Sequence, residues 1–190
     1  MIVRVMKESG WVPALTGLAL SYNKDYRDMW PVADKLANKD NGENKFLESV
    51  CVWLDIDAPR YWWLQFDTYR IGVTKQSGST MHTIMNQPVT QDNFEGEIPQ
   101  NIIDCINAAV EAGEFGVVKR ILPEGFLQRR VVCTNYKALR GIVAQRWSHR
   151  LPEWQTFCRA ILAGVDRPEY IRYNAEKHML KVDPLLCRKL

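Results

Sequence analysis

The chain has 190 residues, of which 46% are hydrophobic and 25% charged, and its formal net charge is +3. This length and ordinary composition predict one folded domain with a sizeable core, and they exclude a chain that is disordered throughout. The net charge is too small to indicate nucleic-acid binding by itself. Because no run has the length of a membrane-spanning helix and residues 1–11 lack the apolar core of a signal peptide, we expect a soluble, cytoplasmic protein.

The cysteines and histidines do not predict a disulfide framework or a metal site. The five cysteines are scattered, none forms a C-x-x-C pair, and the three histidines are isolated in the sequence. Reduced thiols and no bound metal are therefore expected.

The first part of the chain predicts strands and helices in alternation. Residues 1–6 have the composition of a strand, and residues 13–20 begin a helix. Residues 29–42 predict a short helix with Pro near its first turn and a polar, glycine-containing exit. A strand at 50–57 is followed by an aromatic segment at 60–71, which has no helix breaker and predicts a helix.

The strand predicted at 50–57 alternates cleanly between two faces. One face carries Val50, Val52, Leu54 and Ile56, and the other carries Cys51, Trp53, Asp55 and Asp57. This period of two is typical of a half-buried strand. In the following helix, the spacing of Trp62, Phe66 and Tyr69 predicts a stripe that faces the core.

The second part of the chain predicts mostly helices. Residues 72–91 are polar and predict a loop with short strand pieces, and residues 101–113 predict a helix capped by its terminal glycine. Residues 122–146 predict a Leu-Pro corner and then a helix that starts after Gly125. Another helix is expected at 151–163. The elements together indicate one α/β domain over residues 1–190, with a peripheral tail at 168–190.

The segment 122–146 has a spacing that matters for function. Asn135 lies twelve residues after Pro123, and Arg146 lies eleven residues after Asn135. Eleven helical residues make about three turns, so the amide and the guanidinium are expected on one face, roughly 16 Å apart. The residues between them on that face are Leu139 and Ile142. Two such groups can hold an extended anion at two points, but an amphipathic helix with polar ends explains the spacing more simply.

The order of motifs resembles the flavin-dependent thymidylate synthase family. In that family, a strand and an aromatic helix precede the signature Gln-x-x-Arg-His-Arg-x-x-Ser-x-Asn-Glu-x-Ser-x-Arg-Tyr, for which residues 58–82 stand here. The family's Arg-x-x-Leu-Pro corner corresponds to residues 119–123. Its helix Asn-x-Arg-x-Leu-x-Asn-Phe-x-x-x-Arg corresponds to residues 135–146, without a gap. Residues 45–50 resemble its Pro-Phe-Glu-His stretch, with Glu48 in the place of the Glu.

The resemblance assigns roles to particular positions. Arg146 matches the Arg that holds and activates the uracil ring, and Gln65 matches a Gln that contacts the nucleotide. The resemblance implies Arg146 as the catalytic residue, Arg70, Asn135, Lys137 and Tyr69 as flavin-binding residues, and Gln65, Ser79, Lys119 and Gln76 as substrate-binding residues.

The signature is nevertheless degenerate. Thr68 and Tyr69 stand where the family has Arg and His, and Lys119 and Lys137 replace arginines. A guanidinium grips a phosphate through a planar fork, which Thr cannot imitate and Lys imitates only as a point charge. The cations that can compensate by their place in the sequence are Lys75, Arg60, Arg120 and Arg140.

The family implies a fold and a reaction. Its members have a small, mainly antiparallel sheet with a helical layer, and they form homotetramers whose sites lie between subunits. Reduced FAD mediates one-carbon transfer from methylenetetrahydrofolate to C5 of dUMP, with NADPH as the reductant and no cysteine nucleophile.

Three hypotheses remain open for this sequence. The chain is an enzyme acting on dUMP or a related pyrimidine nucleotide, a diverged nucleotide-binding protein without the reaction, or a scaffold without a small-molecule site.

Overall fold

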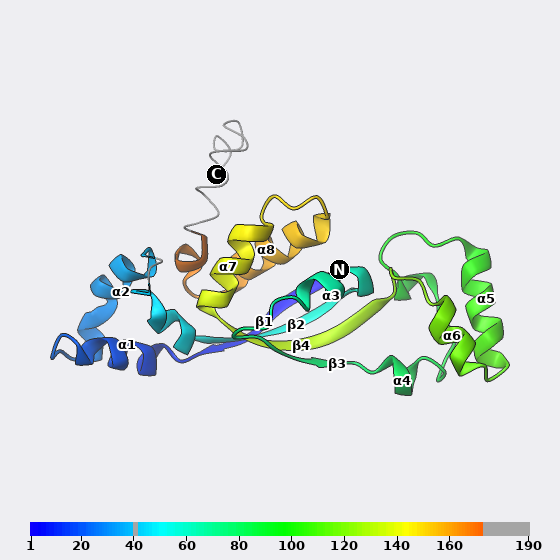
Figure 1. Ribbon diagram of the computed structural model, residues 1–190, viewed down its shortest axis with the longest axis horizontal. Helices are drawn as coiled ribbons and strands as arrows, with labels where there is room; N and C mark the ends of the chain where they lie inside the picture. Colours follow the sequence, from blue (N-terminus) through cyan, green and yellow to red (C-terminus); the bar gives the residue numbers. More distant parts are fainter. Residues whose placement is uncertain (40–41, 173–190) are drawn as a thin grey trace.

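A single antiparallel sheet forms the middle of the computed structural model, which describes residues 1–39 and 42–172 (Figure 1). The strands, in their spatial order, are β1 (Ile2–Ser9), β2 (Cys51–Pro59), β4 (Leu127–Asn135) and β3 (Thr74–Ser77). Each neighbouring pair is antiparallel. The expected fold, a small antiparallel sheet with a helical layer, is therefore confirmed.

Three helices cover one face of this sheet (Figure 1). They are α3 (Arg60–Phe66), α7 (Tyr136–Arg146) and α8 (Pro152–Gly164). Leu54 and Ile56 of β2 are fully buried beneath them, while Trp53 on the opposite face is only half-buried. The alternation predicted for β2 thus selects the face that packs against the helices.

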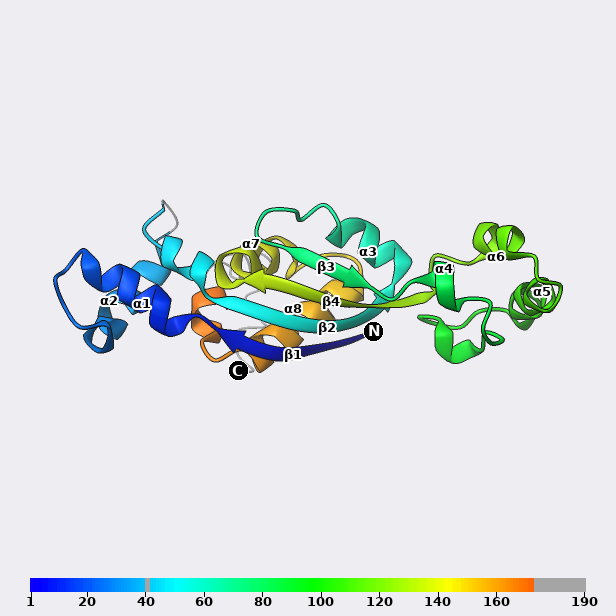
Figure 2. The same ribbon diagram turned by 90° about the horizontal axis from the view of Figure 1, so that it is seen from below.

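The two ends of the elongated molecule are helical extensions beyond the sheet (Figure 2). One end contains α1 (Trp11–Leu20) and α2 (Trp30–Ala37), with short 3-10 helices at Tyr26–Met29 and Lys45–Ser49. The other end contains α4 (Thr80–Thr83), the 3-10 helix Gln91–Asn93, α5 (Gln100–Glu111) and α6 (Phe115–Ile121). This second end has an apolar cluster of its own, which includes Ile84, Phe94, Ile106 and Val118.

The prediction that a helix starts after Gly125 is wrong for Leu127–Asn135. Residues Leu127–Asn135 form β4, an interior strand of the sheet, and the helix begins only at Tyr136. The β-branched side chains of Val131 and Val132 favour an extended backbone, and Val132 is fully buried in the sheet opposite Leu54. The prediction holds for Tyr136–Arg146, and Asn135 is the N-cap residue of this helix.

The remaining predictions agree with the structure except at some boundaries. The helix expected at 60–71 ends at Phe66, because Asp67 is its C-cap and the chain then turns into a loop. The loop expected at 72–91 contains β3 and α4 as short ordered pieces. Residues 168–172 are helical, and the rest of the predicted tail lies outside the described residues.

Candidate functional site

A pocket of about 740 Å³ opens between the loop after α3 and one face of α7. This volume lies in the range of small-molecule sites. It is lined by Glu48, Thr68, Tyr69, Arg70, Ile71, Gly72, Val73, Asn135, Lys137, Ala138, Gly141, Ile142 and Gln145. Four of the positions implied by the resemblance, Tyr69, Arg70, Asn135 and Lys137, therefore line one pocket.

Asn135 is held at the junction of β4 and α7. Its side-chain oxygen accepts a hydrogen bond of 2.9 Å from the backbone N–H of Ala138, which caps the helix. Its amide nitrogen faces the loop at Gly72, whose φ is +67°. Asn135 is thus both the last residue of β4 and the N-cap of α7, which runs along the pocket.

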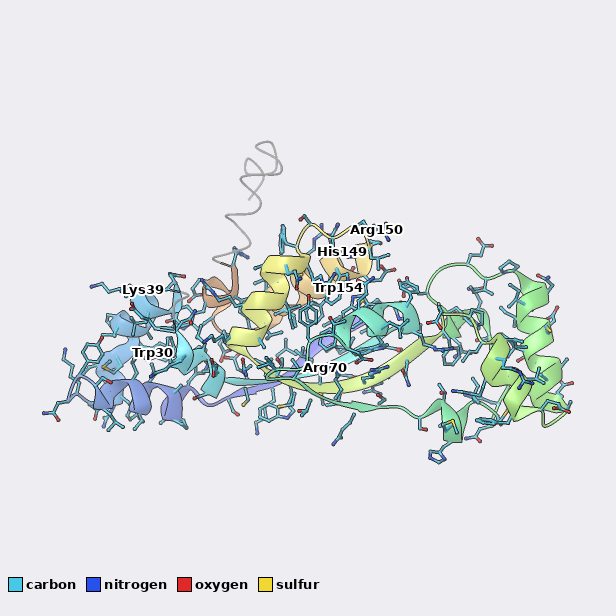
Figure 3. The ribbon with its side chains drawn as sticks, viewed as in Figure 1. Trp30, Lys39, Arg70, His149, Arg150 and Trp154 are labelled. Carbon is cyan, nitrogen blue, oxygen red and sulfur yellow. The ribbon has the colours of Figure 1, made fainter. Side chains whose placement is uncertain are left out.

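The cations at the pocket differ in their partners. The ammonium of Lys137 lies 2.7 Å from a carboxylate oxygen of Glu48. Arg70 is exposed at the level of the sheet, and within the described residues it takes part in no ion pair (Figure 3). Arg70 is thus the guanidinium that is available to an anionic ligand here.

Arg146 lies at the other end of α7 in a polar and aromatic cluster. Its Nε donates a hydrogen bond of 2.7 Å to the hydroxyl of Tyr69, and its guanidinium carbon lies 4.7 Å from the centre of the Trp154 ring. Its Nη1 lies 3.5 Å from the side-chain oxygen of Gln65, which also accepts a 2.9 Å hydrogen bond from the indole of Trp154. The Tyr69 hydroxyl in turn donates to the side-chain oxygen of Gln145, at 2.5 Å.

His149 and Trp154 border this cluster where the chain passes from α7 to α8 (Figure 3). Burial lowers the pKa of His149, and the nearby charges of Arg146 and Arg150 lower it further. Its Nδ1 accepts the backbone N–H of Leu151 at 3.1 Å. A neutral imidazole therefore borders the guanidinium at pH 7 and adds no competing positive charge.

Trp154 and Gln145 are members of the cluster that the sequence motifs do not mark. Trp154 is fully buried in the first turn of α8, and Gln145 lies in the last turn of α7. The position of Gln145 directly before Arg146 is the only signal in the sequence. The role of Trp154 depends on how α8 packs across α3, which no local pattern specifies.

The other three positions implied by the resemblance do not line the pocket. Lys119 donates a 2.7 Å hydrogen bond to the hydroxyl of Thr80, the residue after Ser79, so these two positions are close to each other. They lie at the end of the molecule that contains α4 and α6 (Figure 1). Gln76 is exposed on β3. In one copy of the chain, Ser79, Lys119 and Gln76 thus lie apart from the pocket.

Three of the four proposed compensating cations are engaged elsewhere, and the fourth, Arg120, is exposed on α6. Lys75 lies 2.9 Å from a carboxylate oxygen of Asp67, and Arg60 lies 3.2 Å from one of Glu124. Arg140 is buried and donates to a backbone carbonyl. None of the four lines the pocket.

Two further features bear on the type of site. Across residues 1–39 and 42–172, no group of three or more His, Cys, Asp or Glu side chains is arranged to hold a metal ion. Over the same residues, none of the helices has both the length and the apolar character needed to span a bilayer.

Comparisons with known proteins separate sequence from structure. No family model matches the sequence, and no curated protein matches it. Solved structures do match. A Helicobacter pylori flavin-dependent thymidylate synthase ThyX, complexed with FAD and dUMP, has a TM-score of 0.71 and 14% identity, covering 90% of this chain and 98% of that one. The chain has the flavin-dependent thymidylate synthase fold.

Two more structures support this assignment of the fold. A second structure of the Helicobacter pylori ThyX with FAD and dUMP gives a TM-score of 0.74 at 13% identity, covering 90% of this chain and 97% of that one. The UMP/dUMP methylase PolB from Streptomyces cacaoi, bound with 5-Br dUMP, gives 0.66 at 10% identity, covering 94% of each chain. The likeness in fold thus extends over 90–94% of the chain.

Proposed function

We propose that the protein is a flavin-dependent thymidylate synthase-like enzyme that acts at C5 of a pyrimidine nucleotide, dUMP or a close relative. The observation that carries the proposal is α7, which presents Asn135 at its start beside the pocket and Arg146 at its end. Both residues match motif positions of the family, and the chains of similar fold were complexed with FAD and dUMP or with 5-Br dUMP.

The residues around the pocket fit a flavin nucleotide. Ile71, Val73 and Ile142 supply apolar walls for a planar ring, and Arg70 supplies a guanidinium for the diphosphate. Asn135 keeps an amide N–H₂ group beside the pocket while its oxygen caps the helix. When bound, reduced FAD supplies the hydride equivalents of the reaction, with NADPH and methylenetetrahydrofolate as co-substrates.

Arg146 is the catalytic residue in this proposal. A guanidinium only donates hydrogen bonds, so it can stabilise the electron density on a pyrimidine ring whose C5 acts as the nucleophile toward the one-carbon unit. Its stacking on Trp154 and its hydrogen bond to Tyr69 fix its direction before the ligand arrives. Charge stabilisation by a preorganised donor needs no covalent bond to the protein.

The proposed site takes residues from more than one copy of the chain. Ser79 and Lys119 do not line the pocket of their own chain, and a homo-oligomer, a tetramer by resemblance, would bring them to the pocket of another. Mixing Arg146→Ala with Lys119→Ala tests this, because a mixed oligomer contains some sites with neither substitution. Recovery of turnover is expected, whereas two inactive variants that stay inactive when mixed would contradict the shared site.

The test of the function itself begins with the flavin. Purified protein should be yellow and release FAD on denaturation, and FAD at a hundred times its Kd should stabilise the fold by about 2.7 kcal/mol. Tritium release from labelled dUMP and dCMP then measures the reaction. Arg146→Ala should abolish release and leave FAD bound. Colourless protein that FAD does not stabilise would overturn the proposal.

A second candidate function is nucleotide binding without the reaction. It is favoured by the engagement of Lys75 with Asp67, which leaves Arg70 as the unpaired guanidinium of the degenerate signature loop. In that case the protein binds dUMP or FAD but releases no tritium.

A further inference from the structure

The orientation of the Arg146 guanidinium is determined by three neighbours. A guanidinium carries five N–H donors. The Nε–H is directed to the Tyr69 hydroxyl at 2.7 Å, one Nη1–H is directed toward Gln65 at 3.5 Å, and the guanidinium carbon lies over the Trp154 ring, 4.7 Å from its centre. The remaining Nη donors are the ones available to a ligand.

The direction of the Tyr69 hydrogen bonds follows from the chemistry of its partners. Arg146 can only donate, so the Tyr69 oxygen must accept from it, and the single hydroxyl proton is then free for the Gln145 oxygen at 2.5 Å. Tyr69 is half-buried and also lines the pocket. It therefore lies between the pocket and the guanidinium and contacts both.

The orientation of the Gln65 amide follows in the same way. The indole N–H of Trp154 and the guanidinium of Arg146 both only donate, so the Gln65 atom between them must be the oxygen. Two donors directed at one atom fix the orientation of this amide. The Gln65 nitrogen consequently points away from Trp154 as a further donor.

We propose that Tyr69 is a positioning residue for Arg146, acting with Trp154 and Gln65 to hold the guanidinium with its free Nη donors toward the nucleotide. The inference rests on the proposed function, and it gives Tyr69 a role other than direct contact with the flavin. A rotatable guanidinium loses side-chain entropy when it grips a ligand, and a guanidinium fixed in advance loses less. Tyr69 supplies this restraint from the loop that precedes the pocket.

The experiment compares Tyr69→Phe with Tyr22→Phe in the full chain. Phe keeps the ring beside Arg146 and removes only the hydroxyl. Tyr22 is 46% exposed in a turn near α1, so its substitution is the matched control. Side-chain ¹⁵N NMR measures hydrogen exchange at the Arg146 Nε–H, assigned through Arg146→Lys, and calorimetry measures the Kd for dUMP.

The expected result is a paired change in Tyr69→Phe alone. Exchange at the Nε–H should accelerate, and dUMP should bind several-fold to about tenfold more weakly, because the ligand must then immobilise a side chain that Tyr69 no longer fixes. Circular dichroism and the melting temperature check that the variant is folded. Trp154→Phe, which keeps an aromatic ring but loses the N–H to Gln65, should weaken dUMP binding without accelerating Nε–H exchange to the same extent.

The outcomes separate this inference from the proposed function. If wild-type protein binds dUMP but Tyr69→Phe binds it equally well, the positioning role is overturned, whatever the exchange rate. Unchanged Nε–H exchange in Tyr69→Phe overturns it as well. If wild-type protein does not bind dUMP at all, the proposed function fails, and the exchange measurement shows separately whether Tyr69 restrains Arg146.

Discussion

Gly72 and Asn135 are packed so closely that a Cβ on residue 72 would lie 2.7 Å from the amide nitrogen of Asn135. The φ of Gly72 is +67°, a conformation that other residues rarely adopt. The loop that carries Tyr69 and Arg70 can therefore pack this closely against the start of α7 only because residue 72 is a glycine. This contact connects the two halves of the candidate site.

Gly72→Ala should destabilise the protein through backbone strain and through the collision with Asn135. We expect a loss of about 1–3 kcal/mol in the free energy of unfolding, measured by urea denaturation. Gly113→Ala is the matched control, because Gly113 has a φ of +71° and nothing within 4 Å of its Cβ position. Equal losses in the two variants would show that the contact with Asn135 contributes nothing.

Asn135 should have separable roles in stability and in ligand binding. Asn135→Ala removes the helix cap and should cost about 1 kcal/mol of unfolding free energy. Asn135→Asp keeps an oxygen for the Ala138 N–H and places a negative charge at the helix N-terminus, so its stability should approach that of wild type. It lacks the N–H₂ donor, however, and should bind FAD more weakly. Wild-type FAD affinity in Asn135→Asp would exclude the amide as a flavin contact.

The sequence predicts the elements with clean periodicity and misses the one whose partners are distant. β2 alternates strictly, and the structure buries the expected face. In β4, Arg129 and Arg130 precede Val131 and Val132, so neither a period of two nor one of 3.6 stands out. The strand forms because β2 and β3 lie on both sides of it. That information is not local.

For the candidate site, likewise, the sequence predicts the relation between residues of one helix and misses contacts that depend on how helices pack. Asn135 and Arg146 belong to one helix, so their relation follows from helical geometry. The contact of Arg146 with Gln65 agrees with the implied grouping of these two residues, although their roles remain predictions. Trp154 could not be selected among the seven tryptophans, because its place beside Arg146 depends on the packing of α8.

Acidification should loosen the loop that carries Tyr69 and Arg70. Burial alone would raise the pKa of Asp67, but hydrogen bonds from Lys75 and Arg130 outweigh it and hold this pKa below its ordinary value of 3.8. A carboxyl with a lowered pKa in the folded state stabilises the fold above the ordinary pKa, and this contribution is lost as the pH falls through the lower value.

The melting temperature of wild-type protein should therefore fall below about pH 4, and part of this fall should be absent in Asp67→Asn. Asn cannot ionise, so the variant starts less stable at pH 7 and converges on wild type in acid. Asp104→Asn on α5 is the control, since Asp104 accepts only a neutral side-chain hydrogen bond from Gln100. Parallel melting curves for wild type and Asp67→Asn across this range would contradict the assignment.

The ion pair between Lys137 and Glu48 should matter for ligand binding and little for stability. The side chains of Lys137 and Glu48 are 33% and 56% exposed, and exposed pairs contribute about 0–1 kcal/mol to the free energy of unfolding. If Lys137 serves the flavin, Lys137→Gln should lower FAD affinity several-fold while the melting temperature hardly changes. Lys39→Gln is the control, because Lys39 forms a similarly exposed pair with Glu43 and does not line the pocket. Equal FAD affinity in both variants, measured by flavin fluorescence, would assign Lys137 to the surface ion pair alone.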